Sequence, residues 1–347
     1  MFNILLQMTP ALSRVLVTSV VLGFLAGSFG VFIVLKKQAL AGDTIAHSAL
    51  PGVVLSFILF QSKELEILLI GAAVSGFISI AIFNIIKKYS KIKNDATLAI
   101  LLAGFFGLGR MMLSVVQRSN NAGASGLSSF IFGQAATILL KDMFLTVGVA
   151  IIVNVIIMLF WKEFKIQTFN PEYFNSLGFN SKIVDVLFSI LIVLVVVAGI
   201  QMVGVVLISA LLIAPAVAAR QLNHRLWINY LAAGLIGAIS GFAGVLLANR
   251  FNLPPGPMII VVLTSITLLS LLISKNGVIT KTFKQVRHSY YLKKYADLIR
   301  FYHDEKVSDD NLNLLLEKDY LIKEDGKYQI SDLGIKKVNL ILGDRND

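Results

Sequence analysis

The chain has 347 residues, of which 56% are hydrophobic and only 15% are charged, and its mean hydropathy is +0.79. Soluble domains carry about a quarter charged residues, so this composition excludes an ordinary water-soluble globular protein. The chain contains no cysteine, which excludes disulfides, thiolate metal sites and cysteine nucleophiles. A net charge of +11 raises the question of nucleic acid binding, and the distribution of the charges decides against it.

The charges divide the chain into two parts. Residues 1–280 carry a net charge of +10, whereas residues 281–347 carry +1 although they hold nearly half of all the charged residues. The boundary falls near 275 to 281. We therefore predict a transmembrane domain over 1–278, a basic juxtamembrane linker over 279–294 and a C-terminal domain over 295–347.

The first part consists of long apolar runs separated by short polar stretches. A helix needs roughly 17 to 25 residues to cross about 30 Å of hydrocarbon, or somewhat fewer where protein shields it. The predicted spans are 12–35, 45–60, 67–86, 95–116, 141–161, 183–200, 201–219, 228–248 and 257–274. If the pair divided near Gly199 is one helix, the count falls to eight. The sequence thus predicts an all-α polytopic membrane protein with eight or nine transmembrane helices.

Basic residues gather in alternate loops between these runs, as the positive-inside rule expects of loops in the cytoplasm. This pattern places the N-terminus outside and the C-terminal tail in the cytoplasm. The interrupted segment 119–140 is predicted to be a re-entrant or interfacial piece packed in protein. The basic residues are Lys36 and Lys37, then Lys87, Lys88, Lys91 and Lys93, then Lys162, Lys165 and Lys182, then Arg220 and Arg225.

An acidic residue and a histidine stand out in the stretch LKKQALAGDTIAHSALPGVV. Asp43 and His47 are four residues apart, so on a helix both side chains project from one face and can contact one ion or each other. A carboxylate with an imidazole suits divalent manganese, iron or zinc. Equally, Asp43 could be an N-cap near the interface and His47 a packing residue.

Pro51 and Gly52 follow directly and are predicted to break or bend the helix, freeing carbonyl groups that could line a cavity. Kinks of this kind are just as common without a function. For the other acidic residues of this part, Asp95, Asp142 and Asp185, a position at a helix N-terminus or at the interface is the favoured interpretation.

A second basic stretch, VGVVLISALLIAPAVAARQLNHRLWI, ends an apolar run at Pro215 and acquires Arg220, His224 and Arg225 before the next span. A short basic helix here could bind a partner protein, or the cations could simply anchor a turn at the interface. The chain contains no GxxxxGK[ST] loop, HExxH, GxSxG or paired carboxylates. An intramembrane enzyme is therefore the less favoured class of function.

At these residues the chain resembles the integral membrane permease of bacterial ABC transporters that take up divalent manganese, zinc or iron. The resemblance covers roughly 1–275. It is carried by the stretch from Lys36 to Gly52 that contains the Asp43–His47 pair, NDATLAILLAGFFGLG from Asn94, VGVVLISALLIAPAVAA from Val203, and LPPGP from Leu253.

The resemblance implies a subunit of the bacterial inner membrane that works with a cytoplasmic ATPase and an extracytoplasmic metal-binding protein, as a homodimer or with a related permease. It implies that Asp43 and His47 lie near metal in transit, with no permanently bound cofactor. It also implies that Ala216 to Arg225, with Ala216, Arg220, His224 and Arg225, is the coupling helix that docks into the ATPase.

The C-terminal extension departs from this family pattern. Residues 281–294 hold five Lys or Arg and no acid, which favours contact with anionic membrane lipids. Beyond them we predict a helix with Ser308 as N-cap, two strands around an Asp325–Gly326 turn and a final helix, an order that resembles a small α+β winged helix. Because 295–347 carries a net charge of −4, nucleic acid binding is unexpected, and we predict protein binding or self-association. A fold that serves only as a cytoplasmic plug on the dimer is an equal alternative.

Two other functions remain open at this point. One is a secondary transporter or channel that uses Asp43 and His47 as a metal or proton relay. The other is an ABC importer of a metal chelate, whose wider pathway would not need the pair.

Overall fold

The computed structural model describes residues 9–62, 64–118, 133, 138–223, 225–274, 278–303, 307–324 and 327–343. The chain divides into two compact units, Met1–Leu271 and Leu272–Asp347. Most of the segment 119–140, which we predict to be re-entrant, lies outside the described residues.

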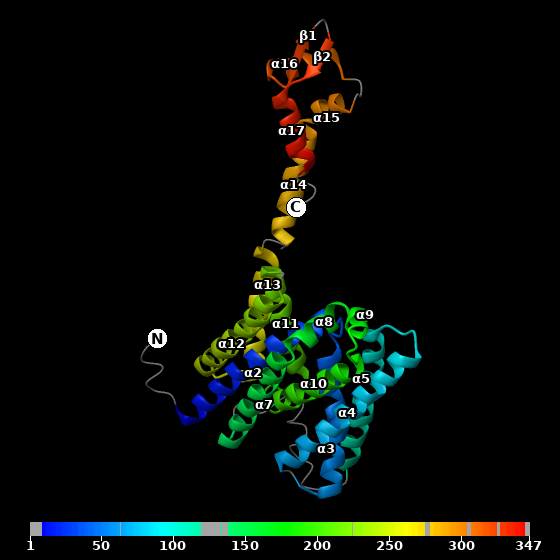
Figure 1. Cartoon of the computed structure of the whole chain (residues 1–347). Helices are drawn as coiled ribbons and strands as arrows, with labels where there is room; N and C mark the ends of the chain where they lie inside the picture. The colour runs from blue at the N-terminus through cyan, green and yellow to red at the C-terminus, as the bar shows by residue number, and fades with distance from the viewer. Residues whose placement is uncertain are drawn as a thin grey trace. The chain divides into compact units, whose positions relative to one another are not determined.

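The first unit is a bundle of helices, and its elements are labelled in Figure 1. Among the described residues, eight helices are long and apolar enough to cross a membrane, in agreement with the prediction of an all-α polytopic protein. The helices are α2 (Pro10–Leu35), α3 (Ala41–Phe60), α4 (Leu65–Tyr89), α5 (Asn94–Arg118), α7 (Leu140–Leu159), α8 (Trp161–Phe169), α9 (Pro171–Ser176), α10 (Ser181–Val203), α11 (Val205–Leu222), α12 (Leu226–Phe251) and α13 (Pro255–Ile273).

Residues 183–219 form two helices, as predicted, but the break between them is not at Gly199. The helices α10 and α11 are separate, but the break lies at Gly204, whose φ is 87°. A positive φ is a conformation that glycine adopts without strain. Gly199, by contrast, lies inside α10, where a Cβ atom would collide with the side chain of Ile208.

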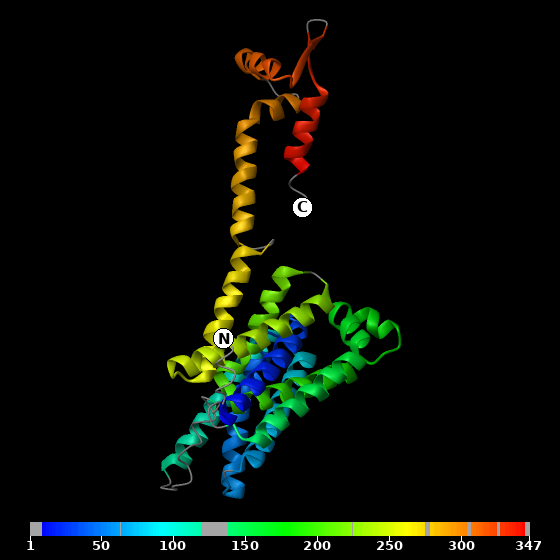
Figure 2. The ribbon, with the colours of Figure 1, turned by 90° about the vertical axis from the view of Figure 1, so that its left-hand side faces the viewer.

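Helix α2 runs through the interior of the bundle, as Figures 1 and 2 show. It packs against α12 and α11 at glycines that let two backbones touch. An added Cβ atom at Gly23 would collide with the carbonyl oxygen of Gly237, and one at Gly30 with that of Leu212. The close approach of α2 to α11 and α12 therefore depends on glycine at these positions.

Several polar side chains inside the bundle bond to a neighbouring helix. Ser48 of α3 donates to Ser79 of α4 over 2.8 Å, and the Tyr230 hydroxyl of α12 donates to Asn154 of α7 over 2.5 Å. Because the hydrocarbon region offers no water, such pairs satisfy groups that would otherwise be costly to bury.

The second unit follows with α14 (Val278–Lys294), α15 (Ala296–Tyr302), α16 (Asp309–Glu317), β1 (Leu321–Glu324), β2 (Lys327–Ile330) and α17 (Asp332–Gly343). The strands pair antiparallel, with Leu321 opposite Ile330. Its core is formed by Leu298, Leu312, Leu315, Leu321 and Val338.

The predicted order of helix, two strands and helix is therefore present in this unit. Ser308 is the N-cap of α16, although its side chain makes no capping hydrogen bond, and the Asp325–Gly326 turn lies outside the described residues. The likeness to a winged helix remains a prediction.

The contact between α2 and α12 gives a test of the bundle. We expect Gly237→Val to lower the free energy of unfolding by about 3 kcal/mol, because the added side chain must push two backbones apart. Gly148→Val is the matched control, since an added Cβ atom at Gly148 of α7 meets nothing within 4 Å. Thermal unfolding in detergent measures both, and equal midpoints would contradict the packing argument.

Candidate functional site

The Asp43–His47 pair lies at the beginning of α3. Leu40 is the N-cap of this helix, so the alternative interpretation of Asp43 as an N-cap is wrong; Asp43 belongs to the first turn. His47 follows one turn later, and its Nε2 atom lies 3.4 Å from Oδ1 of Asp43. The side chain of Asp43 is 28% exposed and that of His47 is 15% exposed, so both stay accessible from one face of the helix.

The imidazole of His47 is only partly satisfied by its surroundings. Its ring meets the ring of Phe106 from α5 edge-on, with 4.8 Å between centroids. Its Nδ1 atom is buried and has no hydrogen-bond partner among the described residues. A buried polar atom without a partner is costly, and the described residues include further ones, among them the hydroxyl of Ser28 and the side-chain oxygen of Asn229.

Pro51 changes the backbone of α3 next to this pair. It lies four residues after His47 and lacks the N–H group that would bond to the carbonyl oxygen of His47, which is therefore left without an intrahelical donor. The predicted helix break does not occur, since α3 continues to Phe60. Packing explains this continuity, because Pro51 is held against Gly109 of α5 and Gly52 against Gly71 of α4.

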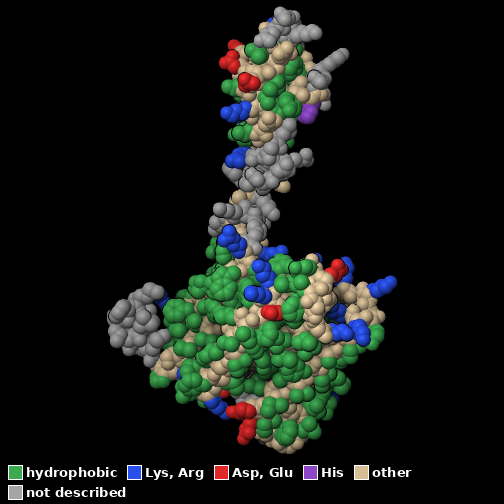
Figure 3. Space-filling model, viewed as in Figure 1, with side chains coloured by type: hydrophobic (Ala, Val, Ile, Leu, Met, Phe, Trp, Pro, Cys, Tyr) green, Lys and Arg blue, Asp and Glu red, His purple; other side chains and the backbone are tan. Residues whose placement is uncertain are grey.

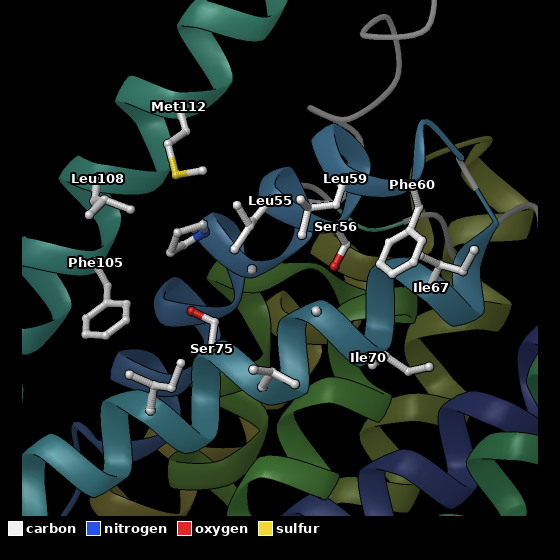
Figure 4. A pocket seen from close by; sticks show the side chains of 15 residues that line it. Leu55, Ser56, Leu59, Phe60, Ile67, Ile70, Ser75, Phe105, Leu108 and Met112 are labelled. Atoms are coloured by element: carbon white, nitrogen blue, oxygen red, sulfur yellow. The ribbon is translucent and has the colours of Figure 1, made fainter.

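A cavity of about 570 Å³ adjoins Pro51 and Gly52, between α3, α4 and α5. Figure 4 shows that Leu55 and Leu59 of α3 and Leu108 and Met112 of α5 border it. The side-chain oxygens along its wall are those of Ser56 and Ser75. A metal ion would find few ligands there, so the cavity is poorly suited to hold a cation.

The described residues contain no group of three or more His, Cys, Asp or Glu side chains that could hold a metal ion. A resident zinc site uses at least three protein ligands.

A partly buried ion pair that the sequence did not reveal joins the C-terminal end of α2 to α10. Nζ of Lys36 lies 3.0 Å from Oδ1 of Asp185 and donates to Gln167 over 2.7 Å, and Gln167 donates to the same carboxylate oxygen over 2.7 Å. Burial lowers the pKa of Lys36, whose side chain is only 8% exposed, and the carboxylate of Asp185 opposes that shift. The network holds the C-terminal end of α2 against α8 and α10, at the turn that leads into α3.

The predicted coupling helix differs from the structure. Ala216 is only 2% exposed, because it lies inside the continuous helix α11 and packs within the bundle. Arg220, near the end of α11, and Arg225, the N-cap of α12, are exposed. His224 lies outside the described residues. The segment is thus the end of a long helix and a turn, and only its basic end can meet a partner.

Two short helices between α7 and α10 form a further exposed surface. Helices α8 and α9 leave large apolar side chains uncovered: Phe169, Tyr173, Leu177 and Phe179. In Figure 3 several Lys and Arg side chains lie along the side of this unit where Figure 1 shows α8, α9 and α11. Exposed apolar side chains between basic residues are typical of a surface that binds protein or the membrane interface.

The chain is similar in sequence to one protein family and to individual transport proteins. A model of the ABC 3 transport family matches residues 8–274. The zinc transport system membrane protein TroC of Treponema pallidum is 40% identical over 280 residues, covering 80% of this chain and 94% of its own. The manganese transport system membrane protein MntC of Bacillus subtilis is 36% identical over 310 residues, covering 89% of this chain and 71% of its own.

A solved structure has the same fold. PsaBC from Streptococcus pneumoniae, in complex with Fab, superposes with a TM-score of 0.69 at 32% identity and covers 80% of this chain and 96% of the matched one. A putative metal-chelate type ABC transporter in an inward-facing conformation gives a TM-score of 0.60 at 15% identity, covering 74% and 84%. The second likeness shows the fold alone.

The Lys36–Asp185 pair gives the second prediction. Asp185→Asn leaves the buried ammonium group without its counterion, so we expect a loss of about 1 to 2 kcal/mol in unfolding free energy, moderated by the partial exposure of Asp185. The control is Glu66→Gln, which breaks the exposed Lys141–Glu66 pair and should change stability little. Denaturant titration in detergent measures the unfolding free energy of both variants. Equal losses for Asp185→Asn and Glu66→Gln would contradict the structural role of Lys36.

Proposed function

The chain belongs to the ABC 3 transport family, and we propose that it is the membrane permease subunit of an ATP-driven importer of divalent manganese, zinc or iron. Family membership and the names of its relatives support metal transport. The observation that carries the proposal in this chain is the Asp43–His47 pair, which puts a carboxylate and an imidazole within 3.4 Å of each other on one helix face.

Asp43 and His47 act on the metal ion as temporary ligands. A carboxylate oxygen and a neutral imidazole nitrogen are ligands that manganese, iron and zinc all accept. The unpaired Nδ1 of His47 and the carbonyl oxygen that Pro51 leaves without a donor are further groups that a hydrated ion could use. Water or a second permease would complete the shell. Binding by few protein ligands allows rapid release, as a transport site requires.

Energy must come from another subunit. The sequence has no P-loop, so this chain lacks the ordinary means of hydrolysing ATP, and a separate cytoplasmic ATPase would supply it. An extracytoplasmic metal-binding protein would deliver the ion, and two permeases, identical or related, would enclose the route. The chain would lie in the bacterial inner membrane with its tail in the cytoplasm.

For the ATPase contact, the proposal combines two neighbouring surfaces. One is the basic end of α11 with Arg220 and Arg225, and the other is the apolar face of α8 and α9 that includes Tyr173 and Leu177. Both occur in loops that the positive-inside rule assigns to the cytoplasm. An apolar patch beside cations is suited to a protein partner that covers the first and neutralises the second.

The C-terminal part has a separate proposed role. The linker 279–294 would bind anionic lipids of the cytoplasmic leaflet through its lysines and arginines. The domain 295–347, with a net charge of −4, would bind protein or a second copy of itself, because its charge repels nucleic acid.

Substitution at the pair tests the site. We expect Asp43→Ala and His47→Asn each to reduce uptake of radiolabelled manganese or zinc at least about tenfold, because a ligand is lost. The amount of protein in the membrane and its binding of ATPase should not change. Asp95→Ala, which removes an exposed carboxylate from the first turn of α5, is the control. Normal uptake by both site variants would refute the site.

Substitution at the exposed loop tests the docking surface. We expect Leu177→Asp to reduce the ATPase that co-purifies with the chain, because a charge enters an apolar contact. Leu253→Asp is the control, since Leu253 is 48% exposed against 47% for Leu177 and lies in the loop assigned to the opposite side of the membrane. Equal ATPase recovery with the two variants would contradict docking at α8 and α9.

A further inference from the structure

The second unit holds a cavity of about 260 Å³ between α14, α15 and α16. Its wall is mainly polar, in contrast to the apolar cavity beside Pro51 in the first unit. Lysine, tyrosine, aspartate and asparagine side chains converge on it, and leucines complete the lining. A concave surface with a few convergent polar groups is the usual form of a small-ligand site.

Helix α16 supplies one wall of this cavity. Asn311, Leu314 and Lys318 line it and follow one another at intervals of three and four, so they share one face of the helix. The side-chain nitrogen of Asn311 donates to Oδ2 of Asp297 over 3.0 Å, which ties α16 to α15. Oδ1 of Asp297 lies 3.7 Å from the guanidinium of Arg300, so the negative charge beside the cavity is already paired.

The end of α16 places Tyr320 at the same cavity. Asp319 follows the helix with a left-handed φ of 59°. The N–H group of Asp319 then donates to the carbonyl oxygen of Leu316, and that of Tyr320 to the carbonyl oxygen of Leu315, each over 3.0 Å. This pattern is a common way to end a helix and turn the chain back. As a result, Leu315 and Tyr320 both line the cavity.

Tyr295, between α14 and α15, is the strongest hydrogen-bond donor of the lining. Its ring meets the ring of Tyr320 edge-on, with 5.9 Å between centroids. Its hydroxyl oxygen accepts hydrogen bonds from Tyr320 and Lys337. The bond from Tyr320, with the positive charges of Lys337 and Lys294, holds the pKa of Tyr295 below its usual value. A hydroxyl group polarised in this way donates its own proton more strongly to a further acceptor.

Two lysines make the cavity locally positive. Lys294 and Lys318 line it, and neither has an ion pair recorded among the described residues. Nζ of Lys294 lies 5.8 Å from the ring centre of each of Tyr290 and Tyr295. Residues 295–347 carry a net charge of −4, so this positive site stands in an acidic domain. Such a site attracts a small anion, whereas the surrounding acidic groups repel an extended polyanion.

We propose that this cavity binds a small phosphate-bearing anion, with Lys294 and Lys318 on the phosphate group and the Tyr295 hydroxyl donating to it. Lysine ammonium groups are common phosphate ligands. Leu314 and Leu315 would cover the carbon part of the ligand. The cavity is smaller than the roughly 300 to 1,000 Å³ of sites for drug-sized ligands, which favours a compact molecule. A soluble phosphate ester and the headgroup of an anionic lipid both carry this chemistry, and the inference does not depend on metal transport.

Equilibrium dialysis of the purified full chain in phosphate-free detergent, with radiolabelled glycerol 3-phosphate as the probe, tests the site. We expect saturable binding that Lys318→Gln and Tyr295→Phe each weaken at least about tenfold, because each removes a hydrogen bond to a charged group. Lys318→Arg, which keeps the charge, should retain most of the affinity. Lys323→Gln is the matched control, since Lys323 is exposed on β1 against Tyr328 and does not line the cavity.

Nanodiscs distinguish the two sources of phosphate. The chain is placed in phosphatidylcholine discs that contain either phosphatidylglycerol or an equal charge of oleate, which has no phosphate. Weaker probe binding with phosphatidylglycerol than with oleate would support the site with a lipid headgroup as its ligand, and equal binding would support it with a soluble ester. Absence of saturable binding by the wild type in both detergent and discs, or equal affinities of Lys318→Gln and Lys323→Gln, would overturn the inference.

Discussion

Hydrocarbon offers no hydrogen bonds, so each polar group that a helix carries to that depth needs a partner or a pocket of water. This constraint sorts the polar residues of the bundle. Ser48 and Ser79 bond to each other, as do Tyr230 and Asn154, and these pairs join helices. Among the described residues, His47 retains a buried nitrogen without a partner, and the hydroxyl of Ser28 and the side-chain oxygen of Asn229 are likewise buried and unpartnered. The His47 imidazole differs from these two groups because it lies 3.4 Å from a carboxylate, and the proposed transport role rests on that pair.

The close approach of helices makes this arrangement possible. Glycines of α2, α11 and α12 bring backbones together at the centre, and Gly109 and Gly71 bring α5 and α4 against α3. With α3 enclosed in this way, Pro51 remains in a continuous helix although it removes a hydrogen bond. The Lys36–Asp185 pair holds the end of α2 at the turn that leads into α3. The position of the Asp43–His47 pair is therefore set by packed neighbours on both sides along the chain.

The sequence predicted the spans, the Asp43–His47 pair and the order of the C-terminal elements, because hydrophobic runs and residues four apart are local patterns. It placed the break near Gly199 instead of Gly204, since composition does not show which glycine adopts a positive φ. It missed the contact of Lys36 with Asp185, 149 residues away, which depends on how helices pack. The burial of Ala216 depends on helix packing, which the sequence pattern does not show.

The central claim is that metal crosses this permease only when a separate ATPase drives it. The most direct measurement is uptake of radiolabelled manganese and zinc into vesicles that contain the chain, with and without the ATPase, the metal-binding protein and ATP. The account predicts that uptake of one or both metals requires the complete set and stops when ATP is omitted. Uptake by the chain alone, driven by an ion gradient, would contradict it and identify a secondary transporter.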